Sequence, residues 1–172
     1  MKLFLIWLVL HIFVWGSLTY PLFESLADHY WRLLGVAFYF TLFFITPLLK
    51  MKIRHLTFLF CIQVGIVTIT FLPTAAYDFN TFVLFVYALL MAEATERLPF
   101  RQMLIVHFIS FLSINGILLI SNVPTMTFLF HTLFIIMLST GLIYYKIKNR
   151  QHQELTSRYE NVYNEFRVLK RR

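Results

Sequence analysis

The chain has 172 residues, of which 59% are hydrophobic and 13% are charged, and its mean hydropathy is +0.73. A soluble domain carries about 25% charged residues, so this composition excludes an ordinary soluble globular protein and indicates an integral membrane protein. The formal net charge of +7 is concentrated in residues 146–172, which hold eight Lys or Arg against three Glu. A basic segment next to a membrane is expected to contact anionic lipid of the inner leaflet rather than nucleic acid.

Six apolar stretches approach the roughly 20 residues that cross a bilayer as a helix. The fourth is the least apolar, because Asp78 and Asn80 lie at one end and Glu93 at the other. The first lacks a small-residue cleavage pattern and is expected to be a retained helix, not a signal peptide. We therefore predict an all-α membrane domain over residues 1–145 with six transmembrane helices: Leu3–Tyr20, Leu33–Leu49, Leu56–Leu72, Tyr77–Ala94, Met103–Ile120 and Met126–Tyr145.

The connections between these stretches are short, and the longest is Tyr20–Arg32. Lys and Arg are enriched in cytoplasmic connections. One set of alternate ends holds Arg32 as its only basic residue, so the other set is expected to be cytoplasmic, together with both termini. That basic set comprises Lys2, Lys50, Lys52, Arg54, Arg97, Arg101, Lys146, Lys148 and Arg150.

The segment AEATERLPFRQML, residues 92–104, forms an expected inner turn between the fourth and fifth spans. Glu93 and Arg97 are four residues apart and can pair on one helix face. Pro99 is expected to end the fourth helix at about Leu98. The charges of this turn are expected at the membrane interface facing water, because a charge at the bilayer centre costs about 2.5–3.5 kcal/mol on the insertion scale.

Residues 146–172 are polar, contain no Gly or Pro, and show apolar residues at alternating steps of four and three. This spacing is typical of a heptad seam and predicts a cytoplasmic helix that pairs with a second copy as a homodimeric coiled coil. A single amphipathic helix on the inner leaflet and a disordered tail are the alternatives. Lys148 and His152 occupy seam positions near the membrane and form a candidate joint. The seam residues are Leu155, Tyr159, Val162, Phe166 and Leu169.

The spans hold few polar residues, and their spacing does not match a metal site, a catalytic triad or a phosphate-binding loop. We therefore expect no catalytic residue, no cofactor and no metal ligand. His107 and His131 lie on neighbouring spans at different depths, so each is expected to be a neutral histidine bonded to a neighbouring helix, with a sensory or proton-linked role as the alternative. The deep polar set is His11, Gln63, His107, Asn115 and His131.

Small residues recur every three positions in the fifth span, at Ser110, Ser113 and Gly116. Small side chains let helices approach closely, so ordinary helix packing is the expected role. An interface that shifts with a signal is the alternative. Together with His107 and Asn115, these residues form the candidate sensing and packing set.

ERLPF at residues 96–100 and MLIVHFIS at 103–110 resemble the sensor portion of DesK-type bacterial sensor histidine kinases. In that family the first motif lies on a cytoplasmic turn, matched here by Glu96, Arg97, Pro99 and Phe100. SRYENVYNEFRVLKRR at 157–172 resembles the linker coiled coil that leads to the phosphoacceptor helices. The resemblance implies a sensor module in a bacterial cell membrane. Some family members have five spans, so five remains an alternative to six.

The chain departs from that family where catalysis is concerned. It has no R-x-x-H-D phosphoacceptor motif, and His152 lies in RQHQE, which does not match it. The chain as given is therefore expected not to be an enzyme, and a response regulator would be a partner only through a missing kinase domain. The expected function is to sense a bilayer or envelope stimulus and pass it to the cytoplasmic helix. The alternative is a small accessory or transporter-associated membrane protein whose basic tail binds a partner or the inner leaflet.

Overall fold

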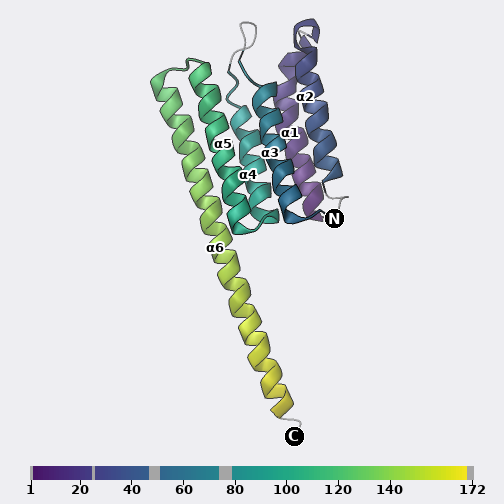
Figure 1. Ribbon diagram of the computed structural model, residues 1–172, viewed down its shortest axis with the longest axis vertical. Helices are drawn as coiled ribbons and strands as arrows, with labels where there is room; N and C mark the ends of the chain where they lie inside the picture. The colour runs from purple at the N-terminus through teal and green to yellow at the C-terminus, as the bar shows by residue number, and fades with distance from the viewer. Residues whose placement is uncertain (1, 25, 47–50, 74–78, 170–172) are drawn as a thin grey trace.

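The computed structural model describes residues 2–24, 26–46, 51–73 and 79–169, and side chains within them except those of 2–4, 21–24, 26–29, 164–165 and 167–169. Over these ranges the chain is all-helical, with six helices and no strand (Figure 1). The helices are α1 (Lys2–Glu24), α2 (Leu26–Ile45), α3 (Ile53–Thr70), α4 (Val83–Arg97), α5 (Phe100–Ile120) and α6 (Thr125–Leu169).

The six helices pack as two layers of three. In one layer α3 lies between α2 and α5, and in the other α4 lies between α1 and α6. α4 contacts α1, α3, α5 and α6, so it is the central helix of the bundle. Nine residues of α4 are buried, among them Tyr87, Leu90 and Met91, which have no exposed surface. A polar side chain on this helix must therefore find its partners inside the protein.

Successive helices run in opposite directions, so the amino end of α3, the carboxyl end of α4 and the amino end of α5 lie at one end of the bundle (Figure 1). α6 leaves the bundle at this same end and continues as a single projecting helix. We call it the basic end, because the side chains of Lys52, Arg54, Arg97, Arg101 and Lys146 belong to it.

Three helices are long and apolar enough to cross a membrane: α3, α5 and the first part of α6. This is compatible with a membrane protein. α1 and α2 each contain a shorter apolar helical stretch, at Leu5–Tyr20 and Tyr30–Ile45. α4 has only 15 residues, which is about 22 Å of helix against a hydrocarbon thickness of about 30 Å. The predicted fourth span Tyr77–Ala94 is wrong in its bounds, because residues 79–82 are not helical and α4 extends from Val83 to Arg97; residues 74–78 lie outside the described ranges.

The predicted connection Tyr20–Arg32 is wrong in its extent. α1 continues to Glu24 and α2 begins at Leu26, so helix occupies most of that segment. Leu and Ala have high helix propensity, and a few charges at the end of an apolar helix do not stop it. The predicted helices are therefore too short on this side.

Arg32, the basic residue predicted at the opposite end, is fully buried. Its Nη1 and Nη2 donate hydrogen bonds to the carbonyl oxygens of Thr70 and Leu72, at 2.5 and 2.8 Å. Thr70 is the last residue of α3 and Leu72 follows it, and carbonyl oxygens at the carboxyl end of a helix have no backbone N–H of the same helix to bond. A positive charge is also favourable at a helix carboxyl end. Arg32 thus ties α2 to the end of α3.

The turn between α5 and α6 lies at the same end as Arg32 and is short. Asn122 has a positive φ of 47°, a conformation that Asn adopts more readily than most residues. Pro124 then precedes α6, which begins at Thr125. α5 and α6 therefore form a tight antiparallel hairpin.

The closest approach between helices that a glycine permits is at Gly35. A Cβ placed there would overlap Thr70 Oγ1 and lie 3.2 Å from Thr70 Cβ. Thr70 is buried, so it cannot move aside into open space. By contrast, a Cβ at Gly65 or at Gly116 would have no neighbour within 4 Å. Close packing through a small residue is therefore seen at Gly35 and not at Gly116, where the spacing in the fifth span predicted it.

Replacing Gly35 with Leu is expected to force α2 away from α3 and to lower the free energy of unfolding by about 1–3 kcal/mol, as overpacking does. Gly65→Leu is the matched control, because it adds the same side chain where space is open. Thermal unfolding of the purified protein in detergent, followed by circular dichroism, measures both. Equal loss in the two variants would contradict the tight contact at Gly35.

Candidate functional site

The turn between α4 and α5, which was predicted as the inner turn and keeps that name below, has the helix end and the ion pair that its sequence predicts. α4 ends at Arg97, and Leu98 caps it with an extended backbone before Pro99. Arg97 Nη2 lies 2.9 Å from Glu93 Oε1 in an i, i+4 salt bridge. Both predictions are confirmed.

The expectation that the charges of this turn all face water is wrong for Glu93, which is 2% exposed. α1 and α4 are neighbours, and α1 brings His11 to the carboxylate, with 3.9 Å between His11 Nε2 and Glu93 Oε2. His11 is fully buried as well. Glu93 therefore belongs to a polar cluster inside the basic end of the bundle, and the salt bridge to Arg97 compensates its charge there.

Tyr39 on α2 completes this cluster. Its hydroxyl lies 2.9 Å from His11 Nε2, and His11 Nδ1 lies 2.8 Å from the backbone oxygen of Trp7. A carbonyl oxygen only accepts, so Nδ1 carries the hydrogen in the neutral imidazole, and Tyr39 donates to Nε2. His11 Nε2 and Glu93 Oε2 then both present lone pairs, and Glu93 Oε2 has no hydrogen-bond partner among the described residues. The cluster, His11–Tyr39–Glu93–Arg97, joins three helices.

Glu96 connects the inner turn to both neighbouring helices of its layer. The indole Nε1 of Trp7 donates to Glu96 Oε2 at 3.0 Å, which ties the turn to α1. Lys146 Nζ lies 3.4 Å from the backbone oxygen of Glu96, which ties it to α6 where that helix leaves the bundle. Glu96 is thus a contact point between the first helix and the last.

His107 joins α4, α5 and α6. Its Nε2 lies 2.9 Å from Thr95 Oγ1 and 3.1 Å from the backbone oxygen of Met91, and its Nδ1 lies 2.9 Å from Ser139 Oγ. Nε2 faces a carbonyl and carries the hydrogen, so Nδ1 accepts from Ser139 in the neutral ring. The predicted bonding of His107 to neighbouring helices is confirmed, and it places a polar link between α5 and α6.

The other members of the candidate sensing and packing set lie further along α5. Ser110 is fully buried, and Ser113 and Gly116 are half-buried. Asn115 donates through Nδ2 to the backbone oxygen of Phe111 and accepts from Thr132 on α6 at 2.7 Å. Asn115 and His107 therefore both link α5 to α6, whereas the small residues of the set do not make polar contacts between helices within the described ranges.

His131 lies toward the opposite end from His107, as predicted from their depths. Its Nδ1 is 2.5 Å from the backbone oxygen of Thr127, one turn earlier in α6, and its Nε2 has no hydrogen-bond partner among the described residues. The expected bond to a neighbouring helix is therefore wrong for His131. Its ring contacts Phe79 at a centroid distance of 5.6 Å. The remaining deep polar residue, Gln63, is buried in α3. These two residues are not part of the cluster at the basic end.

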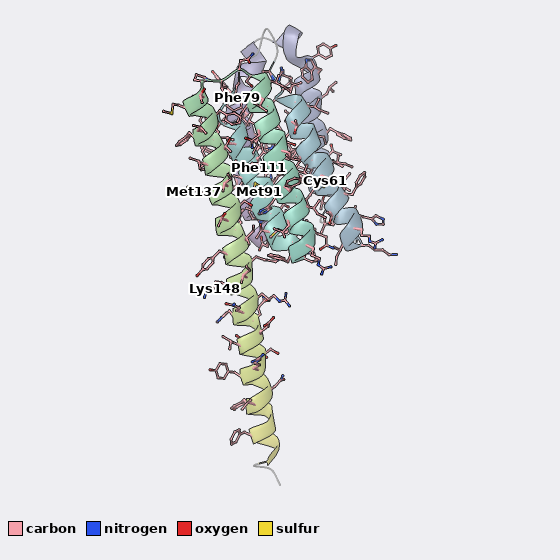
Figure 2. The ribbon with its side chains drawn as sticks, turned by 60° about the vertical axis from the view of Figure 1, so that its left-hand side comes forward. Cys61, Phe79, Met91, Phe111, Met137 and Lys148 are labelled. Carbon is pink, nitrogen blue, oxygen red and sulfur yellow. The ribbon has the colours of Figure 1, made fainter. Side chains whose placement is uncertain are left out.

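The candidate joint at Lys148 and His152 lies within α6, which is one continuous helix from Thr125 to Leu169. Lys148 marks the point where α6 has left the other helices (Figure 2). The described seam side chains of the projecting helix are exposed: Leu155, Tyr159, Val162 and Phe166. The side chain of Leu169 lies outside the described set. A helix is thus established for this segment, and its pairing with a second copy stays a prediction.

The cluster around His11 was not predicted from the sequence. Glu93 was expected in a turn, and His11 was expected as an isolated polar residue in the first span. The available signal was depth, since His11 and Glu93 both lie toward the basic ends of their helices. Which helices are neighbours could not be read from one sequence, so the partnership stayed hidden.

No known family model, curated protein or solved structure matches the chain. Among the side chains that the structure describes, no three His, Cys, Asp or Glu residues are grouped so that they could hold a metal ion. The chemistry that the described residues support is polar linkage between helices, concentrated where α6 leaves the bundle.

Replacing Arg97 with Gln is expected to lower the free energy of unfolding by about 3 kcal/mol, because the buried Glu93 carboxylate then loses its compensating cation and either stays unpaired or has to take up a proton. Arg101→Gln is the matched control, since Arg101 lies just after the same α4–α5 turn, at the start of α5, and is exposed. Thermal unfolding in detergent at neutral pH measures the difference. Equal stability of the two variants would show that Arg97 does not compensate Glu93.

Proposed function

We propose that the chain is the membrane-embedded sensing and transmitting module of a DesK-type bacterial sensor histidine kinase of a two-component system. The observation that carries the proposal is α6, one helix whose first half packs against α4 and α5 and whose second half projects with apolar residues at heptad spacing. The resemblance of residues 96–110 and 157–172 supports the same assignment. Phosphoryl transfer and contact with a response regulator would belong to a kinase domain outside this sequence.

We further propose six membrane spans with both termini in the bacterial cytoplasm. α1 and α2 have 23 and 20 residues, or about 34 and 30 Å of helix, which is enough to cross the hydrocarbon. α4 is shorter, but it packs among four helices and needs no continuous lipid-facing surface. Basic side chains concentrate at the end where α6 emerges, which favours that end as cytoplasmic.

The proposed mechanism is mechanical. A stimulus in the bilayer changes the packing of the helices, and the hydrogen bonds from Ser139 to His107 and from Lys146 to Glu96 couple that change to α6. The projecting helix then rotates, shifts or loosens against its sister copy. Lys148 and His152 place polar side chains where a stable seam needs apolar ones, so the coil is weakest there.

Single cysteines at Tyr159 and Phe166 test the pairing, in a Cys61→Ala background because Cys61 is the only native cysteine. Both are expected to give a disulfide-linked dimer in native membranes, since seam positions of two parallel helices lie within disulfide reach. Cysteine at Ser157, on the opposite face of the heptad, is the matched control and should crosslink several-fold less. If none of the three cysteines crosslinks and lipid shields them, the result would favour the alternative of an accessory protein whose tail binds the inner leaflet.

Leucine at Lys148 and His152 tests the joint. In a fusion of this chain to a kinase catalytic domain, the double variant is expected to lock the coil and to reduce the response of autophosphorylation to temperature or lipid composition. Lys148→Gln with His152→Gln keeps these positions polar and should preserve the response. An unchanged response in the leucine variant would overturn the joint.

A further inference from the structure

A groove lined mostly by polar and charged residues lies between the inner turn and α6, beside Lys146, the first basic residue after the apolar run of residues 126–145. We call it the polar groove. Its volume is about 730 Å³, within the range of small-ligand sites. The turn contributes Glu96 and Phe100, and α6 contributes Ile147, Arg150 and Glu154. Lys146, at the end of the apolar run, also lines it.

A second, apolar cavity of about 240 Å³ lies between α5 and α6, further into the bundle than the groove, and it is open to the outside along one side. Its apolar walls are Leu104, Phe108, Phe111 and Ile136. The polar groups that reach it have partners already: His107 and Ser139 bond to each other, and Thr140 donates to the backbone of Ile136. An occupant therefore needs to supply no hydrogen bond.

The two sites follow one stripe on each helix. On α5 the polar groove includes Phe100 and the cavity begins one turn later at Leu104. On α6 the cavity ends at Thr140, and Ile147 lies two turns later in the groove. Steps of four and seven residues keep side chains on the same helix face. The two sites are therefore stacked along the α5–α6 interface, polar at the basic end and apolar further into the bundle.

The polar groove contains charges of both signs. Lys146 and Arg150 are its cations, and Glu96 and Glu154 are its carboxylates. Lys146 has three donors, and its hydrogen bond to the backbone of Glu96 is long, at 3.4 Å. Arg150 and Glu154 form a salt bridge of 3.0 Å that is exposed and therefore weak enough to exchange partners. The groove complements a group that carries both an anion and a cation.

We propose that the polar groove and the apolar cavity at the α5–α6 interface together form a binding site for one phospholipid with an amine-bearing headgroup. The phosphate lies against Lys146 and Arg150, the ammonium against Glu154 and Glu96, and an acyl chain enters the cavity beside Leu104 and Ile136. An anionic lipid without an amine pairs with the two cations but offers no positive charge to the two carboxylates, which repel it. Its binding is therefore weaker. The site requires insertion in a membrane and does not depend on the proposed signalling role.

Native mass spectrometry of the full-length protein, delipidated in detergent and offered equal amounts of dioleoyl phosphatidylethanolamine and dioleoyl phosphatidylglycerol, tests the site. The wild-type chain is expected to retain one phosphatidylethanolamine. Lys146→Gln with Arg150→Gln removes the phosphate partners and should reduce the adduct about tenfold. Thr140→Trp fills the cavity and should do the same without changing a charge.

Each variant has a matched control on the same helix. Lys148→Gln with Arg158→Gln removes two charges that do not line the groove, and Met137→Trp adds an indole on the outer face of α6, where Met137 is 74% exposed (Figure 2). Both controls should keep the adduct. Circular dichroism checks folding, and if the charge variant unfolds, the Thr140→Trp pair decides.

Equal retention by the test and control variants would overturn the site, because the lipid would then be bound around the whole bundle. Preferential retention of phosphatidylglycerol would overturn the amine-bearing headgroup. Loss of the dimer in crosslinking experiments leaves this result unaffected, so failure of the proposed function and failure of the lipid site are distinguished.

Discussion

The structure depends on a buried carboxylate on its central helix. Glu93 has almost no contact with solvent, and a charge removed from water is tolerated only when other groups replace the water. Here Arg97 supplies a salt bridge of 2.9 Å from the same helix, and α1 and α2 enclose the carboxylate with His11 and Tyr39. This cluster therefore connects α1, α2 and α4 next to the turn that leads to α5 and α6.

That arrangement gives the basic end two different kinds of contact. Apolar side chains of α4 make the core, and such packing specifies distance but little direction. Hydrogen bonds and ion pairs have strict geometry, so the contacts of His11, His107 and Glu96 fix how the helices are turned relative to one another. A rearrangement of the helices has to break or exchange these bonds. This is why polar residues that are few in number have a large influence on which packings the bundle can adopt.

The local features of the sequence predicted local structure well. Pro99 ended a helix, an i, i+4 spacing made a salt bridge, and the absence of Gly and Pro after Tyr145 allowed one long helix. Features that depend on which helices are neighbours were not predictable, because a single sequence holds no record of them. The contact of Gly35 with Thr70 and the partnership of His11 with Glu93 are both of this kind. Charge alone suggested that Glu93 faces water, and the packing of α1 on α4 overrode it.

The length of α6 beyond its tight turn at Asn122 has a geometric consequence. At 1.5 Å per residue, Ser139 lies about 21 Å from the start of α6, and Phe166 lies about 62 Å from it. If the turn acts as a pivot, the helix is a lever with its short arm in the bundle. A sideways displacement at Ser139 then becomes one about three times larger at Phe166, so a sub-ångström adjustment among packed side chains reaches the far tip as a movement comparable to the width of an atom.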